Sequence, residues 1–192
     1  MITMQPLASE AAPDCGSSGL VVVSVVSHGH KHQVQGLLND LVRFSRGRIS
    51  RVVLTLNQPE AAPQPPAAGW PFALHIVRNI RPLGFGANHN RALSGAGEPF
   101  VCVLNPDVRW DGCDPLEAMV QAAAQPGVGC SYPVQIDNVG CWQDSARALP
   151  TPAALFRRRV LGQREARVDW VNAACLVLPQ PVWQRLQGFD EA

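Results

Sequence analysis

Residues 20–30 read Leu-Val-Val-Val-Ser-Val-Val-Ser-His-Gly-His, a nearly unbroken apolar and β-branched run that stops at a polar turn. A parallel strand that is covered by helices on both faces has this composition. From Gln33 to Phe44 the apolar residues recur at helical spacing, so a helix follows the strand. Strand and helix together predict an α/β fold, and the polar turn between them predicts an edge of the sheet that faces a ligand.

The segments after this helix continue the α/β order and predict a mostly parallel central sheet flanked by helices. A turn from Arg81 to Asn90 that contains two glycines runs into a helix that ends near Gly95 or Gly97. A further helix begins after Asp114, which is suited to be its N-cap, with Pro115 at its first position. The other expected segments are strands at 51–56, 73–77, 100–104 and 171–178, a short strand near 134, and a Pro- and Ala-rich loop at 59–71; the helix that begins after Asp114 is expected to end at 124.

Composition predicts one folded domain. The chain has 192 residues, of which 46% are apolar and 16% charged, enough for a single core. Residues 1–18 are rich in Ala, Ser, Pro and Gly without periodicity, so we expect a disordered leader followed by one domain over 19–192. A formal charge of +1 gives no overall field for binding nucleic acid.

The cysteines and the N-terminal residues indicate a cytoplasmic protein. The six cysteines are scattered, with no C-x-x-C pair and no histidine at zinc-ligand spacing. The first nineteen residues lack the pattern of a secretory signal, and no apolar run approaches membrane-spanning length. We therefore expect a reducing compartment.

Two features could carry chemistry, and each has a simpler interpretation. Gly84 and Gly86 precede a helix, where backbone N–H groups can cradle phosphate, although glycine there also simply permits a tight turn. Asp107 follows a buried strand that Asn105-Pro106 terminates, and its carboxylate at a strand end suits a hard divalent cation. Its simpler interpretation is a turn or cap aspartate. His28, His30 and His32 alternate in a loop that leads into a helix, which favours solvated side chains over a metal site.

Four ordered motifs identify a resemblance. They are Gly84-Phe85-Gly86-Ala87-Asn88-His89-Asn90, Asn105-Pro106-Asp107, Asp169-Trp170-Val171-Asn172-Ala173-Ala174 and Gly188-Phe189-Asp190-Glu191. In this order, from about Val21 to the last residue, the sequence resembles family two glycosyltransferases, in particular bacterial rhamnosyltransferase-like enzymes. The resemblance implies a GT-A Rossmann-like fold. It also implies metal-dependent, inverting transfer of a sugar such as rhamnose, in the synthesis of bacterial cell-surface polysaccharide.

The resemblance also implies ligands and site residues. The donor would be a dTDP-, UDP- or GDP-sugar, the acceptor a saccharide or lipid-linked molecule, and the cofactor Mg²⁺ or Mn²⁺ bound by Asp107. Leu56 stands where many members carry an aspartate that contacts the nucleobase, which leaves the nucleotide open. The residues implied around the donor are Ser27, His28, Gly29, Asn57, Gly84, Phe85, Gly86, Asn88, Asn90, Asn105 and Asp107.

The same resemblance places Trp170, Asn172, Ala173, Asp190 and Glu191 near the donor sugar and the acceptor. Members more often carry glycine at the position of Ala173, so the extra methyl group would narrow the site. Trp170 has a second interpretation as a core anchor, because an aromatic side chain buries much area.

The sequence ends at Ala192, whereas the family normally continues to a Glu-Asp pair that supplies the general base. We therefore expect a C-terminally truncated GT-A domain whose catalytic residue is unknown. The alternative function is a catalytically weak or inactive nucleotide-sugar-binding or interaction module. Exposed apolar surface would then be covered in a homodimer.

Two further interpretations concern partners and reaction class. The basic cluster Arg157 to Arg159 would either meet an anionic lipid diphosphate, with peripheral association at the inner face of the membrane, or be a solvated face. A nucleotidyltransferase would need a Gly-rich loop with Lys or Arg directly after the first strand. Residues 27–31, Ser-His-Gly-His-Lys, match that pattern only weakly.

Overall fold

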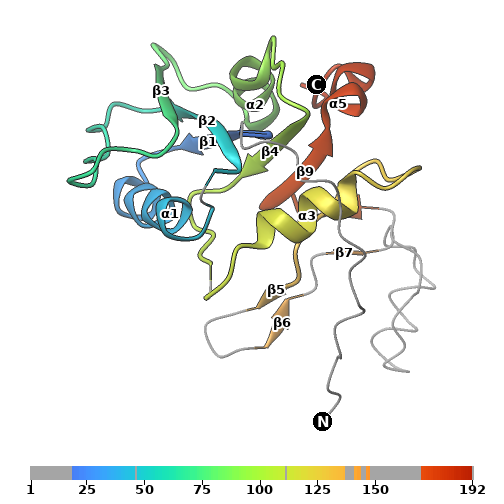
Figure 1. Ribbon diagram of the computed structural model, residues 1–192. Coiled ribbons are helices and arrows are strands. Elements are labelled where there is room, and N and C mark those ends of the chain that lie inside the picture. Colours follow the sequence, from blue (N-terminus) through green and yellow to red (C-terminus); the bar gives the residue numbers. More distant parts are fainter. Residues whose placement is uncertain are drawn as a thin grey trace, which may run out of the picture.

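The computed structural model describes residues 19–45, 47–110, 112–136, 141–143, 146–147 and 170–191. A five-stranded sheet with the order β3-β2-β1-β4-β9 forms its centre (Figure 1). Strands β1 (Val21–Ser27), β2 (Ile49–Leu56), β3 (Ala73–Arg78) and β4 (Phe100–Leu104) are parallel, and β9 (Cys175–Pro179) pairs antiparallel with β4. The predicted mostly parallel α/β sheet is therefore confirmed.

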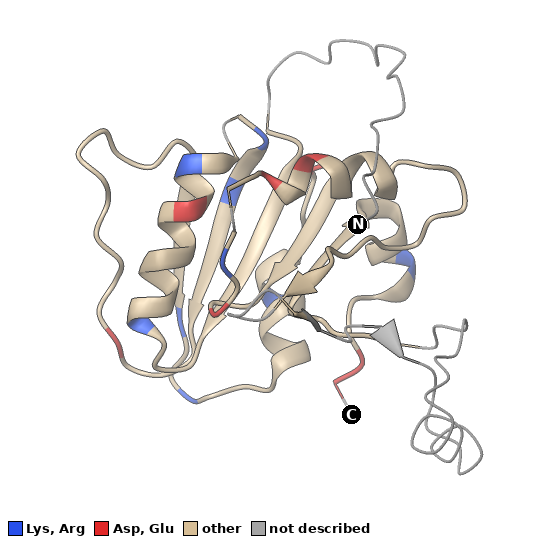
Figure 2. Ribbon diagram, turned by 90° about the horizontal axis from the view of Figure 1, so that it is seen from below, with Lys and Arg blue, Asp and Glu red and all other residues tan. Residues whose placement is uncertain are grey.

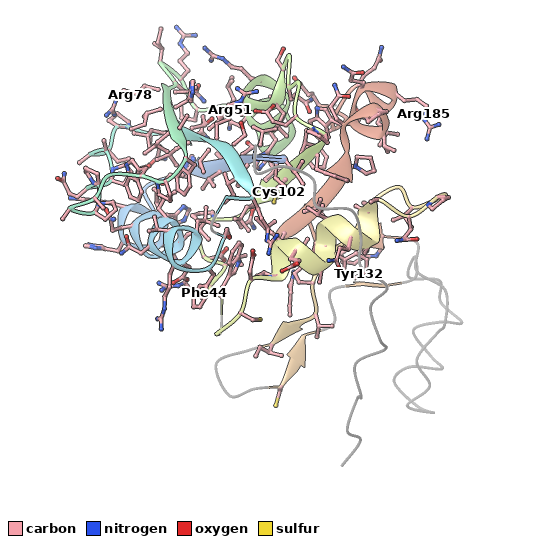
Figure 3. All side chains as sticks on the ribbon, viewed as in Figure 1. Phe44, Arg51, Arg78, Cys102, Tyr132 and Arg185 are labelled. Atoms are coloured by element: carbon pink, nitrogen blue, oxygen red, sulfur yellow. The ribbon has the colours of Figure 1, made fainter. Side chains whose placement is uncertain are left out.

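Helices cover both faces of this sheet. On one face α1 (Lys31–Phe44) and α3 (Pro115–Ala123) pack on alternate residues of β1, and on the other α2 (Phe85–Leu93) and α5 (Gln180–Leu186) pack on the residues between them. Because both faces are covered, β1 is buried except at half-buried Val26, which explains its nearly unbroken apolar sequence. In Figure 3 Cys102 of β4 lies within this central sheet, whereas Arg185 of α5 projects from the periphery.

Local features of the sequence correctly predicted most of these helices and strands. Asp114 caps α3 as predicted, because its side chain accepts a hydrogen bond from Leu116 N at 3.0 Å, and Pro115 takes the first helical position. The predicted strand near Val134 is β5 (Gln135–Ile136), which pairs with β6 (Trp142–Gln143).

The last part of the chain differs from the prediction. A single strand over 171–178 is wrong, because a turn at Ala173-Ala174 divides it into β8 (Trp170–Val171) and β9. Strand β8 leaves the main sheet and pairs with β7 (Ala146–Arg147). Helix α5 was not predicted, because Pro181 and only seven residues give little periodicity to recognise.

Charged residues of both signs are interspersed along the described ribbon, in keeping with the small net charge (Figure 2). None of the described helices has the length and apolar character needed to span a bilayer. Among the described cysteines, Cys102, Cys113, Cys130 and Cys175 are free thiols. The predicted leader at 1–18 and the basic cluster at 157–159 lie outside the described residues.

Candidate functional site

A cavity of about 390 Å³ opens at the carboxyl edge of the parallel strands. Strands β1, β2 and β4 end there, and the turn before α2 closes one side. In an open α/β sheet this edge is where ligands bind. The cavity is lined by Val26, His28, His30, Gln33, Asn57, Leu83, Phe85, Asn88, Asn105, Pro106 and Asp107.

The loop after β1 presents His28 to this cavity. Ser27 is buried, and its Oγ accepts a hydrogen bond from His30 N at 3.2 Å, so Ser27 shapes the loop from beneath. Gly29 has φ of 83°, a left-handed conformation that glycine adopts without strain. His28 is exposed, and Asn57 Nδ2 lies 3.1 Å from its Nδ1. The amide nitrogen of Gln58 lies against the other ring nitrogen, Nε2, so two side chains from the end of β2 hold the His28 ring in place.

Three asparagines form a network beneath the cavity. Asn79 Nδ2 donates to Asn57 Oδ1 at 2.8 Å and to Asn88 Oδ1 at 2.7 Å. The amide groups of Asn57 and Asn88 both donate to the carbonyl oxygen of Leu83, and Asn57 Oδ1 accepts from Leu83 N. Asn57 and Asn88, both predicted to contact the nucleotide-sugar donor, are 4% and 1% exposed. Their hydrogen bonds hold the turn at Leu83 in place. Sequence reasoning missed Asn79, for which no motif gave a signal.

Helix α2 begins at this turn. Gly84 is its N-cap, no side chain caps it, and its first turn contains no acidic residue, so its N-terminal N–H groups stay available. Phe85 is 44% exposed at the cavity. Gly86 faces the other way, because a methyl group there would lie 3.1 Å from the carbonyl oxygen of Asp190 and from Phe189 Cβ. Gly86 therefore permits close packing of the C-terminal segment at its Cα, while its backbone N–H remains in the first turn of α2.

The C-terminal motif is held on α2 by Asn90. Its Nδ2 donates to the Phe189 carbonyl oxygen and to Glu191 Oε1, both at 2.8 Å, and its Oδ1 accepts from Phe189 N. The Phe189 ring packs against Phe85 and Trp183, each at 5.4 Å between ring centroids. The structure thus brings Asn90 together with the predicted Asp190–Glu191 segment, but places none of them in the cavity lining.

Asp107 lies exposed at the end of β4 and lines the cavity together with Asn105. Among the described residues it forms no hydrogen bond or ion pair, so its carboxylate is available to a cation. A divalent cation that bridges phosphates typically takes one or two protein carboxylates and leaves its other positions to phosphate and water. The described residues contain no cluster of three His, Cys, Asp or Glu that would bind a metal alone, so Asp107 and Asn105 fit a cation shared with a ligand.

The loop that follows Asp107 is anchored to α1. Arg109 makes a bidentate ion pair with Asp40, with Nε to Oδ2 at 2.7 Å and Nη2 to Oδ1 at 3.1 Å. Gly36, one turn earlier in α1, leaves space for the guanidinium, since a methyl group there would collide with it. A glycine inside a helix costs about 1 kcal/mol relative to alanine, and here the close approach explains it. A glycine at position 36, inside a helical pattern, was the only sequence feature that indicated a close approach to α1 there.

A second cavity of about 580 Å³ lies on the other side of Asp107. Asn105 and Asp107 line both cavities, and Asn172 lines only the second. Asn105 N donates to Ala174 O at 2.8 Å, which brings the turn before β9 beside β4. Trp170 and Ala173 line neither cavity: Trp170 is 42% exposed, so its interpretation as a core anchor is wrong, and Ala173 packs against the core around α2 and α5.

Beneath the site, His89 of α2 is completely buried. Its Nδ1 lies 2.8 Å from Ser24 Oγ, and its Nε2 has no hydrogen-bond partner. Burial disfavours the imidazolium and lowers the pKa of His89 from 6.5 to about 4. The neutral ring packs edge-on to Phe85, at 4.4 Å between centroids, and so supports the cavity wall.

Sequence comparison finds relatives among bacterial proteins. The N-acetylglucosaminyl-diphospho-decaprenol L-rhamnosyltransferase of Mycobacterium tuberculosis, in strains CDC 1551 / Oshkosh and ATCC 25618 / H37Rv, is 29% identical over 139 residues, which cover 57% of this chain and 45% of that protein. An uncharacterized protein of Sinorhizobium fredii is 29% identical over 133 residues, covering 62% of this chain and 14% of that protein. The chain thus spans less than half the length of these curated relatives. No family model matches it.

Structure comparison identifies the fold. The mannosyltransferase PcManGT from Pyrobaculum calidifontis, in complex with GDP-Man and Mn²⁺, superposes with a TM-score of 0.62 at 18% identity, covering 95% of this chain and 50% of that chain. The chain has the GT-A glycosyltransferase fold, as the four motifs predicted. The similarity to the mycobacterial protein confirms the predicted resemblance to rhamnosyltransferase-like glycosyltransferases.

Proposed function

We propose that this GT-A chain binds a nucleotide-sugar donor in the first cavity and belongs to an enzyme that transfers the sugar to a saccharide or lipid-linked acceptor. One observation carries the proposal: β4 ends with Asn105 and Asp107 in a cavity that His28 and the start of α2 also line. A nucleoside diphosphate needs this combination of a carboxylate for a cation, free helical N–H groups for phosphate, and a polar loop for the nucleoside.

Charge explains why a divalent cation belongs in the proposal. None of the residues that line the first cavity is Lys or Arg, so the diphosphate charge would be met by the cation and by the N-terminus of α2. Asp107 and Asn105 would hold Mg²⁺ or Mn²⁺, which stabilises the departing nucleoside diphosphate when bound. Phe85 offers a half-exposed aromatic face beside His28.

The name of the mycobacterial relative supports the sugar and the acceptor inferred next, and the sequence resemblance supports the rest of the reaction. We infer an inverting transfer, with rhamnose as the sugar and a lipid-linked saccharide as the acceptor, in the synthesis of bacterial surface polysaccharide. The reaction would take place in the cytoplasm, at the inner face of the membrane. Leu56 is buried and apolar at the end of β2, so it offers the base no hydrogen bond, and dTDP, UDP and GDP all remain candidates.

Calorimetric titration tests the donor site. The purified chain is titrated with UDP, dTDP and GDP, each with and without Mn²⁺. We expect one nucleotide to bind with Mn²⁺ and to bind at least about tenfold more weakly without it, because the cation links the carboxylate to the phosphates. Asp107→Asn keeps the shape of the side chain and removes its charge, so it should abolish the effect of Mn²⁺.

Glu117→Gln is the matched control, since it removes an exposed carboxylate on α3 that lines neither cavity. This variant should bind as the unmodified chain does. If no nucleotide binds to a folded sample, or if Asp107→Asn and Glu117→Gln behave alike, the donor site is not where we place it.

A further inference from the structure

The loop between β3 and α2 exposes large apolar side chains at the rim of the first cavity. Ile80 is fully exposed, and Leu83 and Phe85, which line that cavity, are 40% and 44% exposed. Apolar residues scattered singly over a surface are ordinary. Here they follow one another closely in the chain and adjoin a cavity, which indicates a surface that contacts another molecule.

Hydrogen bonds hold this loop in its exposed position. Just before Ile80, Asn79 N donates to the carbonyl oxygen of Leu56 at 3.1 Å, and just after it Leu83 N donates to Asn57 Oδ1 at 2.9 Å. Only a short tip lies between these two anchors, so Ile80 cannot turn inward while both bonds persist. The fold therefore keeps an isoleucine in water, and covering it with an apolar partner would be favourable.

Exposed arginines without a charged partner surround the loop. Arg78, Arg81 and Arg91 are exposed, and within the described part of the chain none of them forms an ion pair. Arg78 donates to the backbone carbonyl oxygen of Glu60, and Arg91 donates to the amide oxygen of Asn79. Because these acceptors are neutral, the positive charge of the arginines is not compensated.

The chain around the loop contains no carboxylate to balance this charge, since residues 61–97 include neither Asp nor Glu. The carboxylates of Glu60 and Glu191 contact Gly29 N and the Asn90 side chain instead. Basic residues around exposed apolar side chains match an anionic lipid surface, where arginines meet the headgroups and the apolar groups enter the boundary with the acyl chains. A second copy of this chain would bring like charges together.

We propose that the loop 79–83 docks on an anionic lipid surface, with Ile80 entering the headgroup region and Arg78 and Arg81 contacting lipid phosphates. Leu83 belongs both to this loop and to the lining of the first cavity, so docking places the mouth of that cavity beside the lipid. The inference rests on the proposed function, which locates the reaction at a membrane, and it identifies the surface that makes the contact.

Co-sedimentation with vesicles tests the docking. The purified chain is mixed with unilamellar vesicles of phosphatidylcholine alone, or of phosphatidylcholine and phosphatidylglycerol in equal parts, at low and at raised ionic strength. We expect binding to the anionic vesicles to be at least about tenfold tighter than to the neutral ones, because each arginine near an anionic surface adds to the attraction. Salt should weaken this binding, since it screens exposed charges.

Two variants of the loop give the quantitative test. Arg81→Gln should weaken binding to the anionic vesicles about fivefold and Ile80→Ser about tenfold, and both should unfold in urea as the unmodified chain does. Arg185→Gln and Leu186→Ser make the same changes on α5, where Leu186 is 59% exposed and Arg185 lies on the opposite side of the molecule from Arg78 (Figure 3). These two control variants should bind vesicles as the unmodified chain does.

Nucleotide binding with Mn²⁺ is measured on the same samples. Weakened vesicle binding in both loop variants, with unchanged nucleotide affinity and unaffected control variants, supports the proposal. The proposal is overturned if the unmodified chain does not bind vesicles, as expected for a loop that meets an acidic protein instead, or if it binds neutral and anionic vesicles equally. Unchanged binding in either loop variant also overturns it, as does equal weakening in the control variants. Vesicle binding by a chain that binds no nucleotide would instead refute the proposed function and leave the docking surface in place.

Discussion

Acidification should destabilise this protein through one buried histidine. The pKa of His89 is lowered from 6.5 to about 4 by burial, so the folded chain holds the neutral ring while the unfolded chain takes up a proton below about pH 6.5. The stability contributed by the neutral ring is present above pH 6.5 and is lost as the pH falls toward 4. One pKa unit corresponds to about 1.4 kcal/mol, so the full loss is about 3 kcal/mol. Roughly 2 kcal/mol of it falls between pH 7.5 and pH 5.

Urea unfolding measured at several pH values between these limits checks the magnitude. His89→Asn is the informative variant, because its amide occupies the place of Nδ1, keeps the contact with Ser24 Oγ at 2.8 Å in the native chain, and does not titrate. The variant should be less stable than the unmodified chain at pH 7.5, because a smaller side chain leaves a cavity. Its stability should then fall by about 2 kcal/mol less on going to pH 5.

His75→Gln provides the control, since it removes a histidine that is exposed on the edge strand β3. Its pH dependence should equal that of the unmodified chain. The reasoning is refuted if His89→Asn and the unmodified chain lose the same stability over this range. Equal losses would mean that the His89 ring is protonated in the fold or that His89 is solvated in the native state.

Three further perturbations test the geometry of the site. Gly188→Ala should cost at least about 1–2 kcal/mol in urea unfolding, because φ is 82° and the methyl group would strike the Asn90 side chain, whereas Gly97→Ala, with no atom within 4 Å, should cost little. Asn79→Ala should cost about 1–3 kcal/mol and weaken nucleotide binding in calorimetry, because a buried asparagine oxygen loses its partner. Iodoacetamide should modify exposed Cys113 in the folded chain and leave buried Cys102 and Cys175 unmodified until urea unfolds it; modification of Cys102 in the folded chain would refute this.

The sequence located many residues of the site, but it did not show the role of each residue. The motif around Gly84 and the Asp107 position both reach the carboxyl edge of the sheet, because the ends of strands and the starts of helices are local signals. The role of each residue depends on which distant segment it meets. Asn57 and Asn88 were both predicted to contact the nucleotide-sugar donor, and in the structure both side chains also bond the backbone of Leu83.

The C-terminal motif shows the same limit. Gly86 was predicted as part of a turn at the donor site, and no sequence signal showed that its Cα also faces Phe189 and Asp190, more than a hundred residues later in the chain. Asn90 likewise bonds the backbone of Phe189. No periodicity encodes such a meeting, because it depends on how α2 and the segment after α5 pack on one face of the sheet.

Sequence patterns alone located the strands β1, β2 and β4, the helices α1 and α3 with the Asp114 cap, and the position of Asp107 at a strand end. These features follow from hydrophobic period and from local hydrogen bonds, which act within a few residues. Packing between distant segments set the asparagine network under the cavity, the space that Gly36 leaves for Arg109, and the second cavity beside the buried Trp110. Close packing joins residues far apart in the chain, and the free energy of such contacts leaves no repeating pattern in the sequence.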